Sequence, residues 1–207
     1  MKDITKIPTQ WLEALAKLKE AGLKAVLAGG ALRDLYCGRV PKDVDIFVLH
    51  ENSFGNPFKV ARVVDNDSLW STTQYNQITS HAQIDYVVRH SKTNGGQPPS
   101  FELIGIIGFK SGMELIRRFD FGLNQIGIEN GEIIYTDAFI KDWRHGTFTL
   151  MHAFTYDRSI ERYKTWAAGK YSGWPMEKSG IVLLHEYYKS FERPGAPITA
   201  KYPLEPA

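Results

Sequence analysis

Two aspartates one residue apart, Asp43 and Asp45, open an apolar run that continues over residues 46–49. Side chains alternate between the faces of a strand, so both carboxylates are expected on one face, with Val44 directed into the core. Two like charges at the lip of an apolar strand repel each other unless a cation lies between them. Because Mg²⁺ prefers carboxylate and phosphate oxygens, the pair predicts a Mg²⁺ site for phosphate chemistry, in which a second Mg²⁺ ion activates an attacking hydroxyl.

A paired glycine precedes these acids. Gly29 and Gly30 follow the apolar run 23–28 and lead into Arg33 and Asp34. Glycine between a strand and a helix lets the backbone approach a phosphate, and the N–H groups of a helix start favour negative charge. A Gly-Gly pair alone is most often an ordinary turn, and an Asp-x-Asp alone is most often a solvated strand edge. Their combination at this spacing favours a triphosphate site.

The elements that must position these residues alternate between helix and strand. Leucines and Trp11 at helical spacing predict a helix over 8–22. Apolar runs predict buried strands over 23–28 and 44–49, with a short helix over 31–37 between them. This succession indicates a domain that mixes α and β elements from its beginning.

The rest of the chain is predicted in coarser outline. We expect helices over 68–76, 113–119, 156–168 and 181–191, and strands over 83–89, 101–107, 121–129 and 132–135. Asn130-Gly131 predicts a hairpin turn, and the Gly/Pro-rich stretch 91–100 indicates either an irregular hairpin tip or a mobile lid. Strand signals then stop, so we predict a catalytic domain over 1–145 and a small helical appendage over 146–207 that ends in an extended or disordered, Pro-rich tail.

The composition is that of an ordinary globular protein. The 207 residues carry a net charge of +2 and include one cysteine, Cys37, which excludes an intramolecular disulfide and a Cys-rich zinc site. Six histidines are scattered without the spacing of zinc ligands. The N-terminus lacks a signal-like apolar region and no stretch is long enough to cross a bilayer, so we expect a cytoplasmic protein without membrane association.

The run GGALRDLYCGRVPKDVDIFV, residues 29–48, resembles the first signature of the DNA polymerase β nucleotidyltransferase superfamily, in particular its tRNA CCA-adding and poly(A) polymerase branch. The resemblance implies an α+β fold with a palm-like mixed sheet flanked by helices, which binds a nucleoside triphosphate and two Mg²⁺ ions. It implies that Asp43 and Asp45 are catalytic metal ligands. It places four residues at the triphosphate: Gly29, Gly30, Arg33 and Asp34. Arg33 would either contact phosphate or orient the carboxylates.

A second segment agrees with the first. Residues 117–124, Arg-Arg-Phe-Asp-Phe-Gly-Leu-Asn, resemble the Arg-Arg-Asp-Phe-Thr-x-Asn-Ala signature of the same branch, although Phe119 is inserted and Gln125 stands where Ala is usual. The resemblance implies that Asp120 and Asn124 contact the nucleotide sugar. Two further residues would clamp the triphosphate or simply lie exposed on a helix: Arg117 and Arg118.

The superfamily needs a third carboxylate on a neighbouring strand, which completes the metal site and takes the proton of the incoming hydroxyl. Glu102 is the sole charge in the apolar strand 101–107 and precedes the second signature, as the acidic strand of the family does. Asp85 has the same setting one strand earlier. For either residue the alternative is an acid on the solvated face of a strand.

The resemblance predicts a Mg²⁺-dependent enzyme that transfers an NMP unit from an NTP to a hydroxyl acceptor, with an RNA or tRNA end as the first candidate, and releases pyrophosphate. A complete CCA-adding enzyme continues with long helical domains and a Glu-Asp-x-x-Arg base-selecting segment, and we find no such segment in these 207 residues, so CCA addition itself is not predicted. The alternatives are a non-catalytic nucleotide- or RNA-binding module, and a toxin or defence enzyme that nucleotidylates a protein or a tRNA. Aromatic and basic residues mix over 156–174, which indicates either an RNA-stacking surface or a helix that packs its rings inward.

Overall fold

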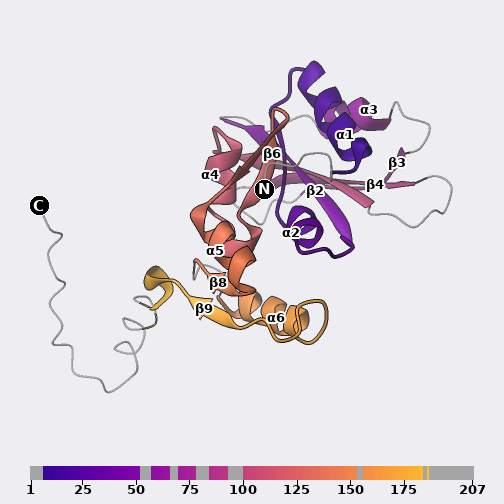
Figure 1. Cartoon of the computed structure of the whole chain (residues 1–207). Coiled ribbons are helices and arrows are strands. Elements are labelled where there is room, and N and C mark those ends of the chain that lie inside the picture. The colour runs from indigo at the N-terminus through magenta and orange to yellow at the C-terminus, as the bar shows by residue number, and fades with distance from the viewer. Residues whose placement is uncertain are drawn as a thin grey trace, which may run out of the picture.

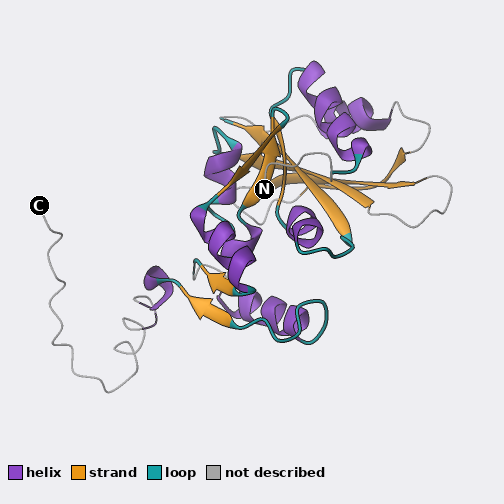
Figure 2. Cartoon of the chain, viewed as in Figure 1, coloured by secondary structure: helices purple, strands orange, loops and turns teal. Residues whose placement is uncertain are grey.

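The computed structural model describes residues 7–51, 57–65, 70–77, 84–92, 100–152, 156–183 and 186. In this part of the chain, helices flank one large sheet (Figures 1 and 2). The strands of that sheet are β1 (Ala25–Ala28), β2 (Asp43–His50), β3 (Trp70–Gln77), β4 (Ile84–Lys92), β5 (Ser100–Ile107), β6 (Ile126–Glu129) and β7 (Glu132–Tyr135). The helices are α1 (Thr9–Glu20), α2 (Gly30–Tyr36), α3 (Pro57–Asp65), α4 (Gly112–Ile116), α5 (Asp137–His145) and α6 (Tyr156–Ala167), with a short 3₁₀ helix η2 (Gly122–Asn124).

The seven strands of the large sheet lie in the order β3-β4-β5-β2-β1-β6-β7. β2 and β5 are parallel, and the other neighbouring pairs in this sheet are antiparallel. β1 ends just before the paired glycines, and β2 carries the two aspartates. Both strands therefore lie inside the sheet and not at its edges. This mixed sheet flanked by helices confirms the predicted α+β fold. A second, two-stranded sheet pairs β8 (Phe148–Leu150) with β9 (Met176–Lys178).

Two hydrophobic clusters cover the two faces of the large sheet. Leu18 of α1, Leu32 of α2 and Val60 of α3 belong to the larger cluster. Leu115 and Ile116 of α4 belong to the smaller one. β2 contributes its even-numbered residues from 44 to 48 to the larger cluster. Its odd-numbered residues, which include both aspartates, therefore face the side of the sheet that carries α4.

The C-terminal part packs onto the sheet domain through an aromatic cluster. Phe148 of β8 stacks on Trp166 of α6 with ring centroids 5.3 Å apart, and meets Tyr171 edge-on at 5.1 Å. Phe121, beside η2, joins the cluster 5.7 Å from Phe148. The rings of this segment thus pack inward, which is one of the two alternatives predicted for it. Figure 1 shows α6, β8 and β9 gathered next to α5.

Some predictions about the elements are wrong. Residues 70–77 form the edge strand β3 and not part of a helix over 68–76, because this Thr- and aromatic-containing stretch pairs with β4. The first residues of the predicted strand 121–129 form η2 instead. The patterns also miss α3, α5, β8 and β9. α5 is preceded by the N-cap Thr136 and followed by the C-cap Gly146, which has a left-handed φ of 65°. Each of these helix-end signals is a single residue, which explains why the sequence pattern missed the helix.

Other predictions fall outside the described residues. They concern the tail, residues 93–99 of the predicted loop, and most of the predicted helix 181–191, of which residues 181–183 are helical. The division of the chain at 145/146 stays a prediction. Among the described residues, no helix has the length and apolar character that crossing a membrane requires.

Candidate active site

The carboxylates of Asp43 and Asp45 share one face of β2. Both residues are half-buried, whereas Val44 and Ile46 are fully buried on the other face. This alternation is the one that an Asp-x-Asp at the start of an apolar strand predicts. The pair lies on the strand that is the parallel neighbour of β5.

Glu102 lies next to this pair. β5 runs parallel to β2, with Glu102 directly opposite Asp45 in the register. Adjacent strands are about 5 Å apart and opposite residues share a face, so the three carboxylates lie on the same face near the starts of two neighbouring strands. On the other side of Glu102, Arg89 of β4 donates from Nε to Glu102 Oε1 at 2.8 Å, and from Nη2 to the same oxygen.

The alternative third carboxylate, Asp85, lies elsewhere. Its residue is 4% exposed on β4, and its charge acts on His50, the last residue of β2. Asp43 is the first residue of the same strand. The geometry therefore brings Glu102, and not Asp85, to the aspartate pair.

The neighbouring acids change the pKa of Asp45. Burial, followed by the negative charges of Asp43 and then Glu102, raises the pKa of Asp45 from 3.8 to about 7. The guanidinium of Arg162 in α6 acts in the opposite direction and offsets this only in part. A bound cation would stabilise the ionised form of Asp45 in this position.

Gly29 has a backbone conformation that other residues avoid, with φ 85° and ψ −128°. A Cβ at this position would lie 3.4 Å from the ring of Phe119. The N–H of Gly29 donates to the carbonyl of Ile126 at 3.0 Å, so this residue contributes a bend and a close approach of the backbone, and not its own N–H. Gly30 begins α2, where a Cβ would lie 3.7 Å from Nη2 of Arg33.

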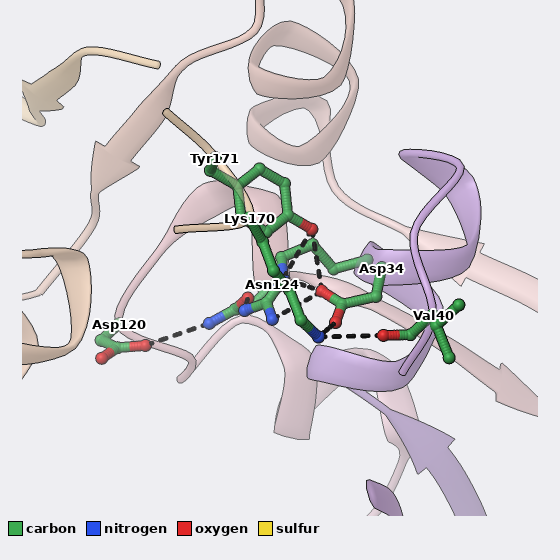
Figure 3. A network of polar contacts seen from close by, with 7 residues as sticks. Asp34, Val40, Asp120, Asn124, Lys170 and Tyr171 are labelled. Atoms are coloured by element: carbon green, nitrogen blue, oxygen red, sulfur yellow. Dashed lines mark hydrogen bonds and ion pairs between the residues drawn. The ribbon is translucent and has the colours of Figure 1, made fainter. Parts of the chain in front are cut away.

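Arg33 and Asp34 form a buried ion pair in α2. Arg33 Nη2 lies 2.7 Å from Asp34 Oδ1, and Nε donates to the same oxygen at 2.8 Å. Lys170 donates from Nζ to Asp34 Oδ2 at 2.6 Å and to the Val40 carbonyl at 2.9 Å, so two cations and one anion meet here (Figure 3). Burial alone would raise the pKa of Asp34, but the charge of Arg33 and the hydrogen bonds from Lys170 and Tyr171 hold it below its ordinary value.

The second signature folds against the first. Asn124 is buried; its Oδ1 accepts from Arg33 Nη1 at 2.9 Å, and its Nδ2 donates to Asp120 Oδ1 at 3.4 Å (Figure 3). Asp120 Oδ2 accepts from Ser159 Oγ at 2.8 Å and from Arg162 Nη1 at 2.9 Å. A chain of polar contacts therefore runs from α2 through η2 to α6.

The two departures from the family signature have roles in this structure. The ring of Phe119, the inserted residue, packs on Phe47 with centroids 5.7 Å apart. Gln125, which replaces the usual Ala, donates from Nε2 to the carbonyls of Arg117 and Phe119 at 3.3 and 3.2 Å, and so satisfies the end of α4. The arginines 117 and 118 themselves are exposed at this end of the helix.

Solved structures of CCA-adding enzymes share this fold. A CCA-adding enzyme from Thermotoga maritima complexed with tRNA matches with a TM-score of 0.59 at 16% identity, over 90% of this chain and 44% of that one. A CCA-adding enzyme in an apo form matches with a TM-score of 0.61 at 15% identity, over 91% and 44%. A tRNA nucleotidyltransferase complexed with a primer tRNA and an incoming ATP analog matches with a TM-score of 0.59 at 19% identity, over 86% and 50%.

The chain has the fold of CCA-adding enzymes over the matched residues. It spans about half, or less, of the length of these solved proteins. No model of a known protein family and no curated protein matches its sequence. The similarity to CCA-adding enzymes that the signatures indicate is thus confirmed at the level of the fold.

Within this nucleotidyltransferase fold, the sequence patterns miss the residues that the C-terminal part contributes. Arg162 contacts Asp120, and both Lys170 and Tyr171 contact Asp34. The mixture of basic and aromatic residues over 156–174 is visible in the sequence, but no spacing connects it to α2, far earlier in the chain. The pairing of Arg89 with Glu102 also has no local signal, because it depends on the register of two strands.

Proposed function

We propose that this protein is a Mg²⁺-dependent nucleotidyltransferase that transfers an NMP unit from an NTP to a hydroxyl acceptor, an RNA or tRNA end in the first instance. The observation that carries the proposal is the placement of Asp43, Asp45 and Glu102 on one face of β2 and β5, with Glu102 opposite Asp45. The fold that it shares with tRNA nucleotidyltransferases supports the same reaction class and the choice of acceptor.

The donor set fits Mg²⁺. Carboxylate oxygens are its preferred protein ligands, and a divalent cation would relieve the repulsion that raises the pKa of Asp45. Within the described ranges, no three or more His, Cys, Asp or Glu side chains form a group that could hold a metal ion by themselves. Mg²⁺ usually takes one or two carboxylates and completes its octahedron with water and substrate phosphates, so Asp43 and Asp45 would hold it together with the triphosphate. Bound there, it would supply Lewis-acid stabilisation of the negative charge that develops on the phosphates.

The residues of the chain then have distinct tasks. The acceptor hydroxyl oxygen forms a bond to the α-phosphorus of the NTP, the bond from that phosphorus to the bridging oxygen breaks, and pyrophosphate leaves. Glu102 accepts the hydroxyl proton, and Arg89 holds one oxygen of that carboxylate in place. Asp120 and Asn124 position the nucleotide sugar.

The proposal is tested by incubating the protein with each labelled NTP, Mg²⁺ and total tRNA. The expected result is label on RNA together with an equal amount of pyrophosphate, both abolished by EDTA. Absence of label and of pyrophosphate with every NTP would contradict it. Label on a co-purified protein in place of RNA would identify a protein as the acceptor and would still support nucleotidyl transfer.

A second candidate is a non-catalytic nucleotide-binding module. It is favoured by one observation, the lack of a preformed metal-binding group among the described residues. Calorimetry that shows NTP binding, combined with no pyrophosphate release across many acceptors, would decide for this function.

A further inference from the structure

Tyr171, from the turn after α6, reaches into the first signature. It is fully buried, and its hydroxyl accepts from Arg33 Nε at 3.2 Å and donates to Asp34 Oδ1 at 2.8 Å (Figure 3). One phenol oxygen therefore bridges the two charged side chains of the Arg-Asp pair. The thiol of Cys37 is a further neighbour of this hydroxyl.

Arg33 is enclosed and does not face solvent. Its residue is 5% exposed, and the guanidinium carbon lies 4.3 Å from the centre of the Trp166 ring. Its nitrogens contact Asp34, Tyr171 and Asn124. A guanidinium that is held on several sides in this way is placed to orient its neighbours, which is one of the two roles expected for Arg33.

The orientation of Asn124 follows from Arg33. Arginine can only donate, so the side-chain atom of Asn124 that faces it must be the oxygen. The amide nitrogen of Asn124 is then directed to Asp120. A rotation of this amide would place its nitrogen against the Arg33 donors and remove it from Asp120 Oδ1, which would then accept only from the Phe121 N–H.

From these contacts we infer that Tyr171 is a positioning residue for nucleotide binding, which fixes Arg33 and, through it, the side chains of Asn124 and Asp120. The inference rests on the proposed function, since it takes Asn124 and Asp120 to contact the nucleotide sugar. It adds to that function a requirement for residues after 150 in building the nucleotide site of the sheet domain.

Tyr171→Phe tests the inference, because it removes the hydroxyl and keeps the ring that packs on Phe148 and Trp174. Tyr163→Phe is the matched control: its hydroxyl donates to the Trp174 carbonyl at 3.0 Å in the same aromatic cluster, away from Arg33. We expect Tyr171→Phe to raise the NTP Kd and KM about fivefold or more, with kcat within about twofold. Tyr163→Phe should leave these constants within about twofold of wild type.

A double-mutant cycle separates positioning from packing. In an Asn124→Ala background, Tyr171→Phe should have almost no further effect on the NTP Kd. As a readout independent of nucleotide, the side-chain NH₂ resonances of Asn124 should shift in Tyr171→Phe and stay in place in Tyr163→Phe. An unchanged Kd and unchanged resonances in Tyr171→Phe would overturn the inference, as would a full effect in the Asn124→Ala background.

The outcomes also separate this inference from the proposed function. Wild-type protein that binds NTP without transfer would remove the catalytic proposal, while the Kd values of the two Tyr→Phe variants would still decide the inference. Failure of wild-type protein to bind any NTP would overturn both.

Discussion

Asp45 and Glu102 lie directly opposite each other on two adjacent parallel strands. Burial, then the charges of Asp43 and Glu102, raises the pKa of Asp45 to about 7. The folded protein, in the absence of a cation, therefore retains a proton that the unfolded chain releases near pH 3.8. This relationship links the stability of the fold to the site that we assign to Mg²⁺.

The first prediction is a pH dependence of stability in the metal-free protein. Since the unfolded chain loses the proton of Asp45 first, the free energy of unfolding should fall as the pH rises from about 4 to about 7, and then level off. The loss is at most about 4 kcal/mol, at ~1.4 kcal/mol per pKa unit. Urea denaturation in EDTA across this range measures it. Asp45→Asn should flatten the slope, and an unchanged slope in that variant would contradict the assignment.

The second prediction decides between the two candidates for the third carboxylate. Glu102→Gln should lower the transfer rate about 100-fold or more, because it removes the proton acceptor beside Asp45. Asp85→Asn should leave the rate within about threefold of wild type once the folded fraction is corrected for, since Asp85 lies at the His50 end of the strands. Pyrophosphate release and thermal unfolding, measured on both variants, provide the comparison. The reverse order of effects would move the base to Asp85.

The third prediction concerns the glycine bend. Gly29→Ala should destabilise the protein, because Gly29 combines a φ of 85° with a ψ of −128°, a region that residues with a Cβ avoid, and we expect a larger loss than for Gly38→Ala, where a new Cβ has nothing within 4 Å. A left-handed conformation alone costs a non-glycine residue about 1–2 kcal/mol. Urea denaturation of both variants should show a larger loss for Gly29→Ala, and equal losses would contradict a special backbone requirement at Gly29.

The shared face of Asp43 and Asp45 and the bend at Gly29 could be predicted from the sequence, because both depend on local patterns. An Asp-x-Asp in a strand must share a face, and a Gly-Gly between strand and helix indicates a bend. The choice between Glu102 and Asp85 could not be made from the sequence, since it depends on strand order and register. β5 pairs directly with β2, while β4 lies one strand further out.

The C-terminal contribution could not be predicted for a similar reason. In the sequence, Tyr171 and Trp174 are two aromatic residues without an evident partner. The fold places the Tyr171 ring against Arg33 and the Trp174 ring against Arg39. The inserted Phe119 looks like a defect in the signature, yet its ring covers Gly29 and packs on Phe47. Departures from a family pattern are thus explained by packing that the pattern does not encode.

The fourth prediction tests the expected boundary at 145/146. A chain that ends at residue 145 loses the ring of Phe148, which packs on Phe121, and both Lys170 and Tyr171, which contact Asp34. Exposure of a buried ring and of a buried ion pair should cost roughly 5 kcal/mol or more. Circular dichroism should show a large drop in Tm for this chain and little change for a chain that ends at residue 186. Equal Tm values would establish 1–145 as an independent domain.

The most direct test of the account is the single-turnover rate of NMP transfer, measured by pyrophosphate release with NTP, Mg²⁺ and tRNA, in Asp45→Asn and in Glu132→Gln. Glu132 is an exposed acid on β7 and serves as the matched control. We expect a loss of about 100-fold or more for Asp45→Asn and a rate within about twofold of wild type for Glu132→Gln. Equal rates for Asp45→Asn and wild type would contradict the assignment of this site to nucleotidyl transfer.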